Sequence, residues 1–142
     1  MDNSERRILA DVRLAQAKEC LVAAQVNIDA DSYKTSANRS YYAIFHAMRA
    51  ILALDNFDSK KHSGIISTFR QQYIKTGKFE GRFSKIITGA SLIRNKSDYD
   101  DFYIAEKSKI SKQLEDAKEF LLAVEKYIAH HENDCSNETD SR

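Results

Sequence analysis

The strongest constraint on the fold is an apolar seam that begins near the N-terminus. Its residues follow one another at intervals of four, three, four, three and four positions: Ala10, Leu14, Ala17, Leu21, Ala24 and Ile28. This spacing keeps the apolar side chains on one side of a helix, and it is typical of helices that pack lengthwise against other helices. Charged Arg13, Lys18 and Glu19 fall off the seam. The pattern therefore predicts an N-terminal helix with one side buried and these charges outside it.

A second seam with the same spacing lies near the C-terminus, and its residues are Ile110, Leu114, Ala117, Leu121, Val124 and Ile128. The residues differ between the two seams, so the shared spacing reflects shallow-angle helix packing rather than an internal repeat. The whole chain contains no proline and four glycines. Because these residue types punctuate strands and turns, their scarcity predicts long helices with few turns. We therefore predict an all-α fold in which the two seam helices are partners in one bundle.

Three further helices are predicted between the seams. Polar residues 29–32 precede a helix over residues 33–54, and a third helix begins near Ser59 and ends at Gly77. The apolar stripe of the third helix is Ile65, Ile66, Phe69 and Tyr73, and that of the fourth is Phe83, Ile86, Ile87, Ala90 and Ile93. A chain of 142 residues usually forms one domain. We expect a single domain over residues 1–131 and a disordered tail over residues 132–142, because ENDCSNETDSR has no apolar face to bury.

The composition narrows the class of protein. With 42% hydrophobic and 30% charged residues, the chain resembles a globular protein and lacks the roughly 18 consecutive apolar residues of a membrane span. The charged start MDNSERRILADV contains no visible secretory signal, so a cytoplasmic location is expected. Cys20 and Cys135 form neither a disulfide framework nor a metal-ligand spacing, and the histidines offer no four-ligand set. We therefore expect no metal, no cofactor and no membrane partner.

The helix over residues 37–54 has two different faces. At about 100° per residue, one face gathers residues expected in the core: Ala37, Tyr41, Ile44, Phe45, Met48, Ile51 and Leu52. The opposite face, called the polar face below, gathers Asn38, Arg39, Tyr42, His46 and Arg49. Composition alone favours a surface on which tyrosines keep their hydroxyls in water and arginines pair with acids. The alanines between these residues would also let another backbone or a ligand come close.

Four segments carry a resemblance to a known family: ANRSYYAIFHAMRAIL, KHSGIISTF, IKTGK and LIRNKSDYD. In content and order they resemble the prokaryotic HEPN family, over about residues 17–127. The resemblance implies an antiparallel up-and-down bundle of four long helices plus a short extra helix, and a homodimer. Many members of that family are metal-independent ribonucleases that act as toxins or defence proteins, often paired with a small nucleotidyltransferase antitoxin.

The family motif Arg-x4-6-His, which two subunits bring together in one cleft, is matched only in part. Arg94 provides the arginine, but Tyr99 follows after four residues, and Asp100 and Asp101 occupy the other two permitted spacings. Histidine suits proton transfer at neutral pH, whereas tyrosine titrates near 10. Arg94 could hold a phosphate, or it could be only a cation that complements a helix C-terminus. The catalytic candidates are Arg94, Tyr99 and His46, although a structural role is the favoured interpretation of His46, and also of His62.

Basic residues concentrate in the middle of the chain. Residues 60–96 hold nine basic residues and one acid, Glu80, a net charge of +8, whereas the whole chain carries +1. Such a segment suits a phosphate backbone, or it is a solvated face that acids of the last helix neutralise in part. Those acids are Glu106, Glu115, Asp116, Glu119 and Glu125. The candidate contacts to RNA or a nucleotide are Arg39, Arg49, Lys85 and Lys96.

Three functions remain open. The chain is a HEPN-type ribonuclease toxin, a non-catalytic module that binds RNA or a nucleotide, or an interaction protein whose partner is a nucleotidyltransferase. In the third case Tyr99 and Tyr103 are candidate acceptors for a nucleotidyl group, although ordinary packing or surface roles are favoured for both. We expect the polar face to meet either a partner subunit or the region around Arg94.

Overall fold

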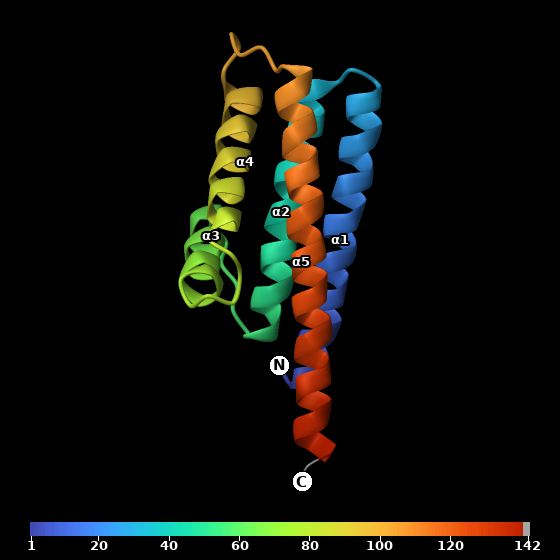
Figure 1. Ribbon diagram of the computed structural model, residues 1–142, viewed down its shortest axis with the longest axis vertical. Coiled ribbons are helices and arrows are strands. Elements are labelled where there is room, and N and C mark those ends of the chain that lie inside the picture. Colours follow the sequence, from blue (N-terminus) through green and yellow to red (C-terminus); the bar gives the residue numbers. More distant parts are fainter. Residues whose placement is uncertain (141–142) are drawn as a thin grey trace.

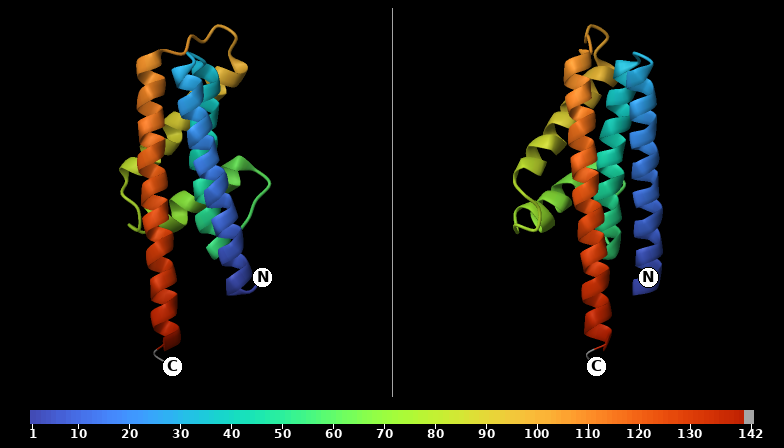
Figure 2. Two further views of the ribbon diagram at one scale, coloured as in Figure 1. Left: turned by 90° about the vertical axis from the view of Figure 1, so that its right-hand side faces the viewer. Right: turned by 45° about the vertical axis from the view of Figure 1, so that its right-hand side comes forward.

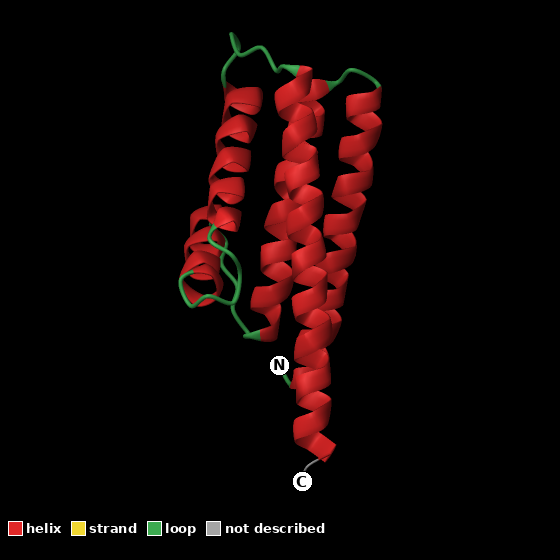
Figure 3. Cartoon of the chain, viewed as in Figure 1, coloured by secondary structure: helices red, strands yellow, loops and turns green. Residues whose placement is uncertain are grey.

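A computed structural model describes the backbone of residues 1–140 and the side chains of residues 1–131. Residues 1–140 form five α-helices (Figures 1 and 3): α1 (Asn3–Asp29), α2 (Tyr33–Leu54), α3 (His62–Phe69), α4 (Arg82–Tyr99) and α5 (Lys107–Asp140). A short π-helical stretch, η1 (Arg70–Ile74), continues α3. Residues 1–140 contain no strand. The predicted all-α fold is confirmed, with four long helices and one short one.

The four long helices alternate in direction along the chain. The Ser36 hydroxyl donates a hydrogen bond to the Ala24 carbonyl, and Arg13 donates one to the Arg49 carbonyl, so α1 and α2 are antiparallel. Side-chain contacts give the same relation between α2 and α4 and between α1 and α5. The chain is therefore an up-and-down bundle, and Figure 2 shows α3 and α4 inclined to α5.

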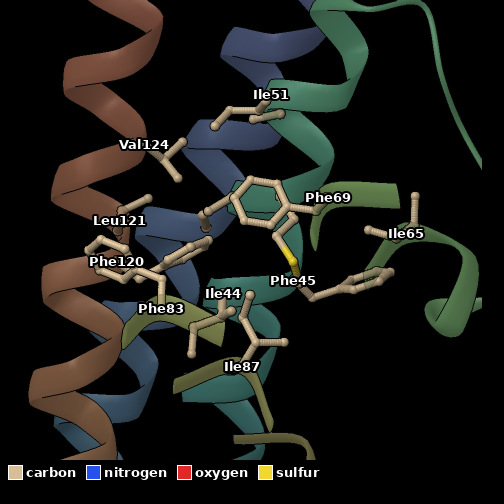
Figure 4. Close-up of a cluster of buried hydrophobic side chains, with 14 of the residues drawn as sticks. Ile44, Phe45, Ile51, Ile65, Phe69, Phe83, Ile87, Phe120, Leu121 and Val124 are labelled. Atoms are coloured by element: carbon tan, nitrogen blue, oxygen red, sulfur yellow. The ribbon is translucent and has the colours of Figure 1, made fainter. Parts of the chain in front are cut away.

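Both predicted seams face the core. Every seam residue of α5 is buried, and in α1 only Leu14 and Leu21 are half-buried. All seven residues of the predicted core face of α2 are buried as well. In Figure 4, Phe69, Phe83 and Phe120 meet from three different helices, and the Phe120 ring centroid lies 5.6 Å from those of Phe69 and Phe83. Because burial of apolar area is the main favourable term in folding, this aromatic contact stabilises the packing of α3, α4 and α5.

One charged residue of α1 is buried although it lies off the apolar seam. Arg13 lies off the seam, as the spacing indicates, but only 6% of its surface is exposed. Its guanidinium donates to the Arg49 carbonyl on α2 at 3.1 Å and to an Asp58 carboxylate oxygen at 3.1 Å. A buried arginine is tolerated because these partners satisfy its donors. The spacing of apolar residues gave no sign of partners so far away in the sequence.

The ends of the helices follow local signals. Asp2 caps α1 by accepting a hydrogen bond from the Glu5 amide at 2.8 Å. Gly77 has a φ of 82°, a conformation that favours glycine, in the turn that follows η1. The α5 backbone continues to Asp140, but the side chains after His131 and residues 141–142 lie outside the described residues, so the predicted tail over 132–142 stays a prediction. Within the described residues no helix is both long and apolar enough to cross a membrane.

Candidate functional site

The polar face of α2 lies where α1, α4 and the start of α3 come together. Its five side chains are all half-buried. Ala43 and Ala50, which lie between them, are fully buried on the side of α2 that contacts α1. The small residues therefore admit the backbone of α1, which was one of the two possibilities that the sequence left open.

Arg94 extends from α4 onto this face. Its Nη2 donates to the Tyr42 hydroxyl at 3.1 Å, its Nε donates to Asp98 at 3.1 Å, and its side chain is only 17% exposed. The guanidinium carbon also lies 5.2 Å from the Tyr41 ring centroid and 5.5 Å from that of Tyr42. Hydrogen bonds and cation–π contacts thus fix the guanidinium against two tyrosines. These contacts restrain Arg94 more than the helix dipole alone would, which was the other role that the sequence allowed for it.

Asp98 connects α4 to the N-terminal part of α2. It accepts hydrogen bonds from Arg94 and from the Asn38 amide at 3.0 Å, while Asn38 accepts from both Nε and Nη2 of Arg39. A cavity of about 340 Å³ adjoins this pair, lined by Lys34, Thr35, Asn38, Ser97 and Asp98. Asp98 thus orients Arg94 from one turn further along the same helix.

His62, the first residue of α3, packs against the core side of the same tyrosines. Its Nδ1 lies 2.9 Å from the Tyr41 hydroxyl, and its ring centroid is 4.2 Å from that of Phe45. Burial lowers the pKa of His62, and the positive charges of Arg94 and Arg49 lower it further. The imidazole is therefore neutral at neutral pH, which is the form that can accept a proton.

His46 lies on the polar face, with its ring centroid 6.1 Å from that of Tyr42. Burial lowers the pKa of His46, and so do Arg49, Arg39 and Arg13. Its Nδ1 is buried and has no hydrogen-bond partner among the described residues. Arg94 is among the charges that act on His62 but not among those that act on His46. Of the two histidines, only His62 has its Nδ1 within hydrogen-bond distance of a partner among the described residues, the Tyr41 hydroxyl.

The other predicted site residues are spread more widely. Arg39 lies over the Tyr42 ring at 5.1 Å, and Arg49 pairs with Asp58 at 3.5 Å. Tyr99 is 73% exposed, and its ring centroid lies 5.7 Å from the Arg94 guanidinium carbon.

Lys96 and Lys85 lie outside the contacts that surround Arg94. Lys96 lies over the half-buried Tyr103 ring at 6.0 Å. Lys85 lines a groove between α4 and α5. The structure thus gathers Arg94, Tyr99, Arg39 and His46 around Tyr42, and it leaves Lys85 apart from them.

Most basic residues of the segment 60–96 form no ion pair with the acids of α5 among the described residues. Arg82 pairs with Glu119 of α5 at 2.6 Å, and among the described residues this is the one ion pair between residues 60–96 and the acids of α5. Glu115 and Asp116 pair instead with lysines of α5 itself. The described residues also contain no group of three or more His, Cys, Asp or Glu side chains placed to hold a metal ion.

Two features of this site were missed from the sequence. The bond between Tyr42 and Arg94 joins residues 52 positions apart, so no local spacing could indicate it. His62 was undervalued because a single histidine carries little information, although its segment KHSG was one of those that carried the family resemblance.

Comparisons with known proteins agree with this architecture. The HEPN domain family matches residues 10–127. A UPF0332 protein of Thermotoga maritima is 28% identical over 125 residues, which cover 88% of this chain and 95% of that protein. Two proteins of Methanocaldococcus jannaschii also match. "Putative toxin MJ0605" is 37% identical over 58% of this chain and 62% of its own length, and "Putative toxin MJ0142" is 27% identical over 81% of this chain and 78% of its own length.

Proposed function

The chain belongs to the HEPN domain family, and we propose that it is a toxin-like cytoplasmic protein that cleaves RNA without a metal ion. The observation that carries this proposal is the Arg94 guanidinium, fixed by Tyr42 and Asp98 beside the neutral imidazole of His62. The matching relatives named as toxins support the toxin-like role. The +8 charge of residues 60–96 supports a phosphate-rich substrate.

Arg94 is the proposed phosphate contact. A guanidinium has five N–H donors, and three of them are directed at Asp98, Tyr42 and Asn95. Two donors remain for phosphate oxygens. Because the guanidinium is already held in place, it can offset the charge that develops on the phosphorane without first being ordered.

His62 is the proposed base for the ribose 2′-hydroxyl. When its Nδ1–H donates to the Tyr41 hydroxyl, its Nε2 carries the lone pair that accepts the proton. His46 is less suited to this step because its buried Nδ1 has no hydrogen-bond partner among the described residues to orient the ring. Exposed Tyr99 beside Arg94 supplies an O–H that can donate to the leaving oxygen. Arg39 and Arg49 extend the positive surface along α2 for neighbouring phosphates, and Lys96 extends it along α4.

A homodimer is part of this proposal. The last residue of α4 and the connector after it expose three apolar side chains, Tyr99 at 73%, Phe102 at 93% and Ile104 at 81%, and Tyr99 lies beside Arg94. Exposed groups of this kind mark interaction surfaces. A second subunit seated on this connector would bring two copies of Arg94 toward one RNA strand.

The test is cleavage of single-stranded RNA in excess EDTA. Wild type is expected to cleave, and Arg94→Ala is expected to lose about 100-fold or more of the rate, as when one charge-stabilising donor is removed. Arg82→Ala is the matched control, because Arg82 lies at the other end of α4 and pairs with Glu80 and Glu119. Equal rates for wild type and Arg94→Ala would refute the proposal.

A second candidate function is that of a partner-dependent module modified by a nucleotidyltransferase. This candidate is favoured because the exposed Tyr99 side chain lies next to the Arg94 guanidinium. The guanidinium could bind the phosphate of the incoming nucleotide while the Tyr99 hydroxyl accepts the nucleotidyl group. Intact-mass measurement after co-expression with such an enzyme should then show an added nucleotidyl group. The addition should disappear in Tyr99→Phe if Tyr99 is the acceptor, or in Tyr103→Phe if Tyr103 is. An unshifted mass with an active partner enzyme would exclude this candidate.

A further inference from the structure

A second cavity lies between α4 and α5. It has a volume of about 340 Å³, and ten residues line it: Lys85, Ile86, Gly89, Ala90 and Ile93 of α4, and Ser108, Lys109, Lys112, Gln113 and Asp116 of α5. Arg94 contacts α2 instead, so this groove is separate from the site described above. The volume falls in the range of small-molecule sites.

Gly89 keeps this groove open. It lies in the interior of α4, where glycine destabilises a helix relative to alanine. A Cβ atom added at Gly89 would meet nothing within 4 Å, so no neighbouring group requires the missing side chain. Packing therefore gives no reason for a glycine here, whereas an occupant of the groove would.

The rim of the groove is positively charged. Lys85 comes from α4, and Lys109 and Lys112 come from the first turns of α5. Lys112 pairs with Asp116 at 2.9 Å, but within residues 1–131 neither Lys85 nor Lys109 makes an ion pair. Lysines from two helices that border one cavity, together with the positive end of α5, favour an anionic group.

Gln113 provides a further polar group at the groove. It is 4% exposed, and its Nε2 donates to the Ala37 carbonyl at 3.4 Å. Its Oε1 is buried and receives no hydrogen bond from any described residue. Buried acceptors are normally paired, so this oxygen suits an O–H or N–H donor on an occupant.

We propose that the groove binds a small organic acid with an apolar body. Ile86, Ala90 and Ile93 would contact the apolar body, Lys85 or Lys109 the acidic group, and Gln113 a hydroxyl or amide hydrogen. A nucleotide fits less well, because its sugar and base would place many polar atoms against isoleucine and alanine. The proposal is independent of RNA cleavage at Arg94.

The test uses the full-length protein and the fluorescent dye anilinonaphthalene sulfonate, which is itself an apolar organic acid. Wild type should bind one dye per chain, with binding that saturates and weakens as salt rises. Gly89→Leu fills the groove and should weaken binding by about tenfold or more, while Gly81→Leu, just before α4, should leave it unchanged. Lys109→Ala should weaken binding several-fold, and exposed Lys126→Ala on the same helix should not.

Two further measurements keep the proposal falsifiable if Gly89→Leu folds poorly. In wild type, the dye should shift the backbone amide NMR signals of Gly89, Ser108 and Lys112, and shifts confined to other segments would overturn the proposal. Decanoate should displace the dye, whereas AMP should not, and displacement by AMP at equal concentration would overturn it. If Gly89→Leu instead changes the oligomeric state and still binds the dye, the groove is a contact surface for another protein chain. That result would also overturn the proposal that the groove binds an organic acid.

Discussion

Replacing Arg13 with alanine should destabilise the protein far more than its position off the apolar seam suggests. The side chain is 7% exposed and joins α1 to the Arg49 carbonyl of α2 and to Asp58 of the following loop. Burial, and then the charge of Arg49, lowers the pKa of Arg13. The guanidinium nevertheless stays charged, because the ordinary pKa of arginine lies so far above neutrality.

The magnitude follows from the contacts that the substitution removes. Losing the buried hydrogen bond to the Arg49 carbonyl costs roughly 1.5 kcal/mol, as for other hydrogen bonds to a charged group. The bond to Asp58 adds only about 0.5 kcal/mol, because that carboxylate is 54% exposed and solvent screens it. Losing the buried apolar stem of the arginine side chain adds about 1–2 kcal/mol. Relief of the desolvation of the charge offsets part of this, so the net loss is about 2–3 kcal/mol.

Urea unfolding followed by circular dichroism measures this loss. Lys18→Ala is the matched control, since Lys18 lies on the same helix, is 55% exposed and pairs with Glu125 at 3.6 Å, so it should cost about 0.5 kcal/mol. Arg13→Met keeps the stem and should recover about half of the loss. Equal losses in Arg13→Ala and Lys18→Ala would refute the reasoning, because the buried contacts would then contribute nothing.

Three other predictions concern stability and pH. Phe120→Ala should lower the free energy of unfolding by about 3–5 kcal/mol in the same assay, because the ring is fully buried between Phe69 and Phe83, and a loss near 1 kcal/mol would contradict this packing. Gly89→Ala should instead raise it by about 0.5–1 kcal/mol, because the added Cβ meets open space, and a loss of stability would contradict that geometry. Lowering the pH below about 6.5 should destabilise wild type, because burial lowers the pKa of His46 and the unfolded chain then binds more protons than the folded one. The loss should continue until the pH falls below the lowered folded-state pKa, and it should be smaller in His46→Gln. An unchanged slope in that variant, measured by urea unfolding at several pH values, would assign the effect to other groups.

Much of the bundle could be predicted from the sequence, because helix packing leaves a periodic record. The seams of α1 and α5 and the core face of α2 were all identified from intervals of three and four residues. Arg13 escaped this reasoning because its burial depends on Asp58 and on the backbone of another helix. Periodicity reports which side of a helix is apolar, and a charged residue beside the seam can still be buried when distant partners satisfy it.

The candidate site was less accessible to sequence reasoning. Arg94 and the polar face of α2 were both identified, but their contact through Tyr42 depends on how α2 and α4 align. His62 follows Tyr42 by 20 residues and precedes Arg94 by 32, and it lies near their contact only because α3 begins against Tyr41 and Phe45. Contacts of this kind follow from tertiary packing, so no spacing rule within one helix could predict them.

The central claim is that Arg94 binds the phosphate while His62 acts as the base. The rate of RNA cleavage by His62→Gln in excess EDTA tests this claim most directly. Glutamine keeps a polar side chain of similar size but cannot accept a proton at neutral pH. The rate should fall by about 100-fold or more relative to wild type, as for loss of a general base, while His130→Gln at an exposed position of α5 should cleave normally. Cleavage by His62→Gln at the wild-type rate, by a protein with unchanged circular dichroism, would contradict the account.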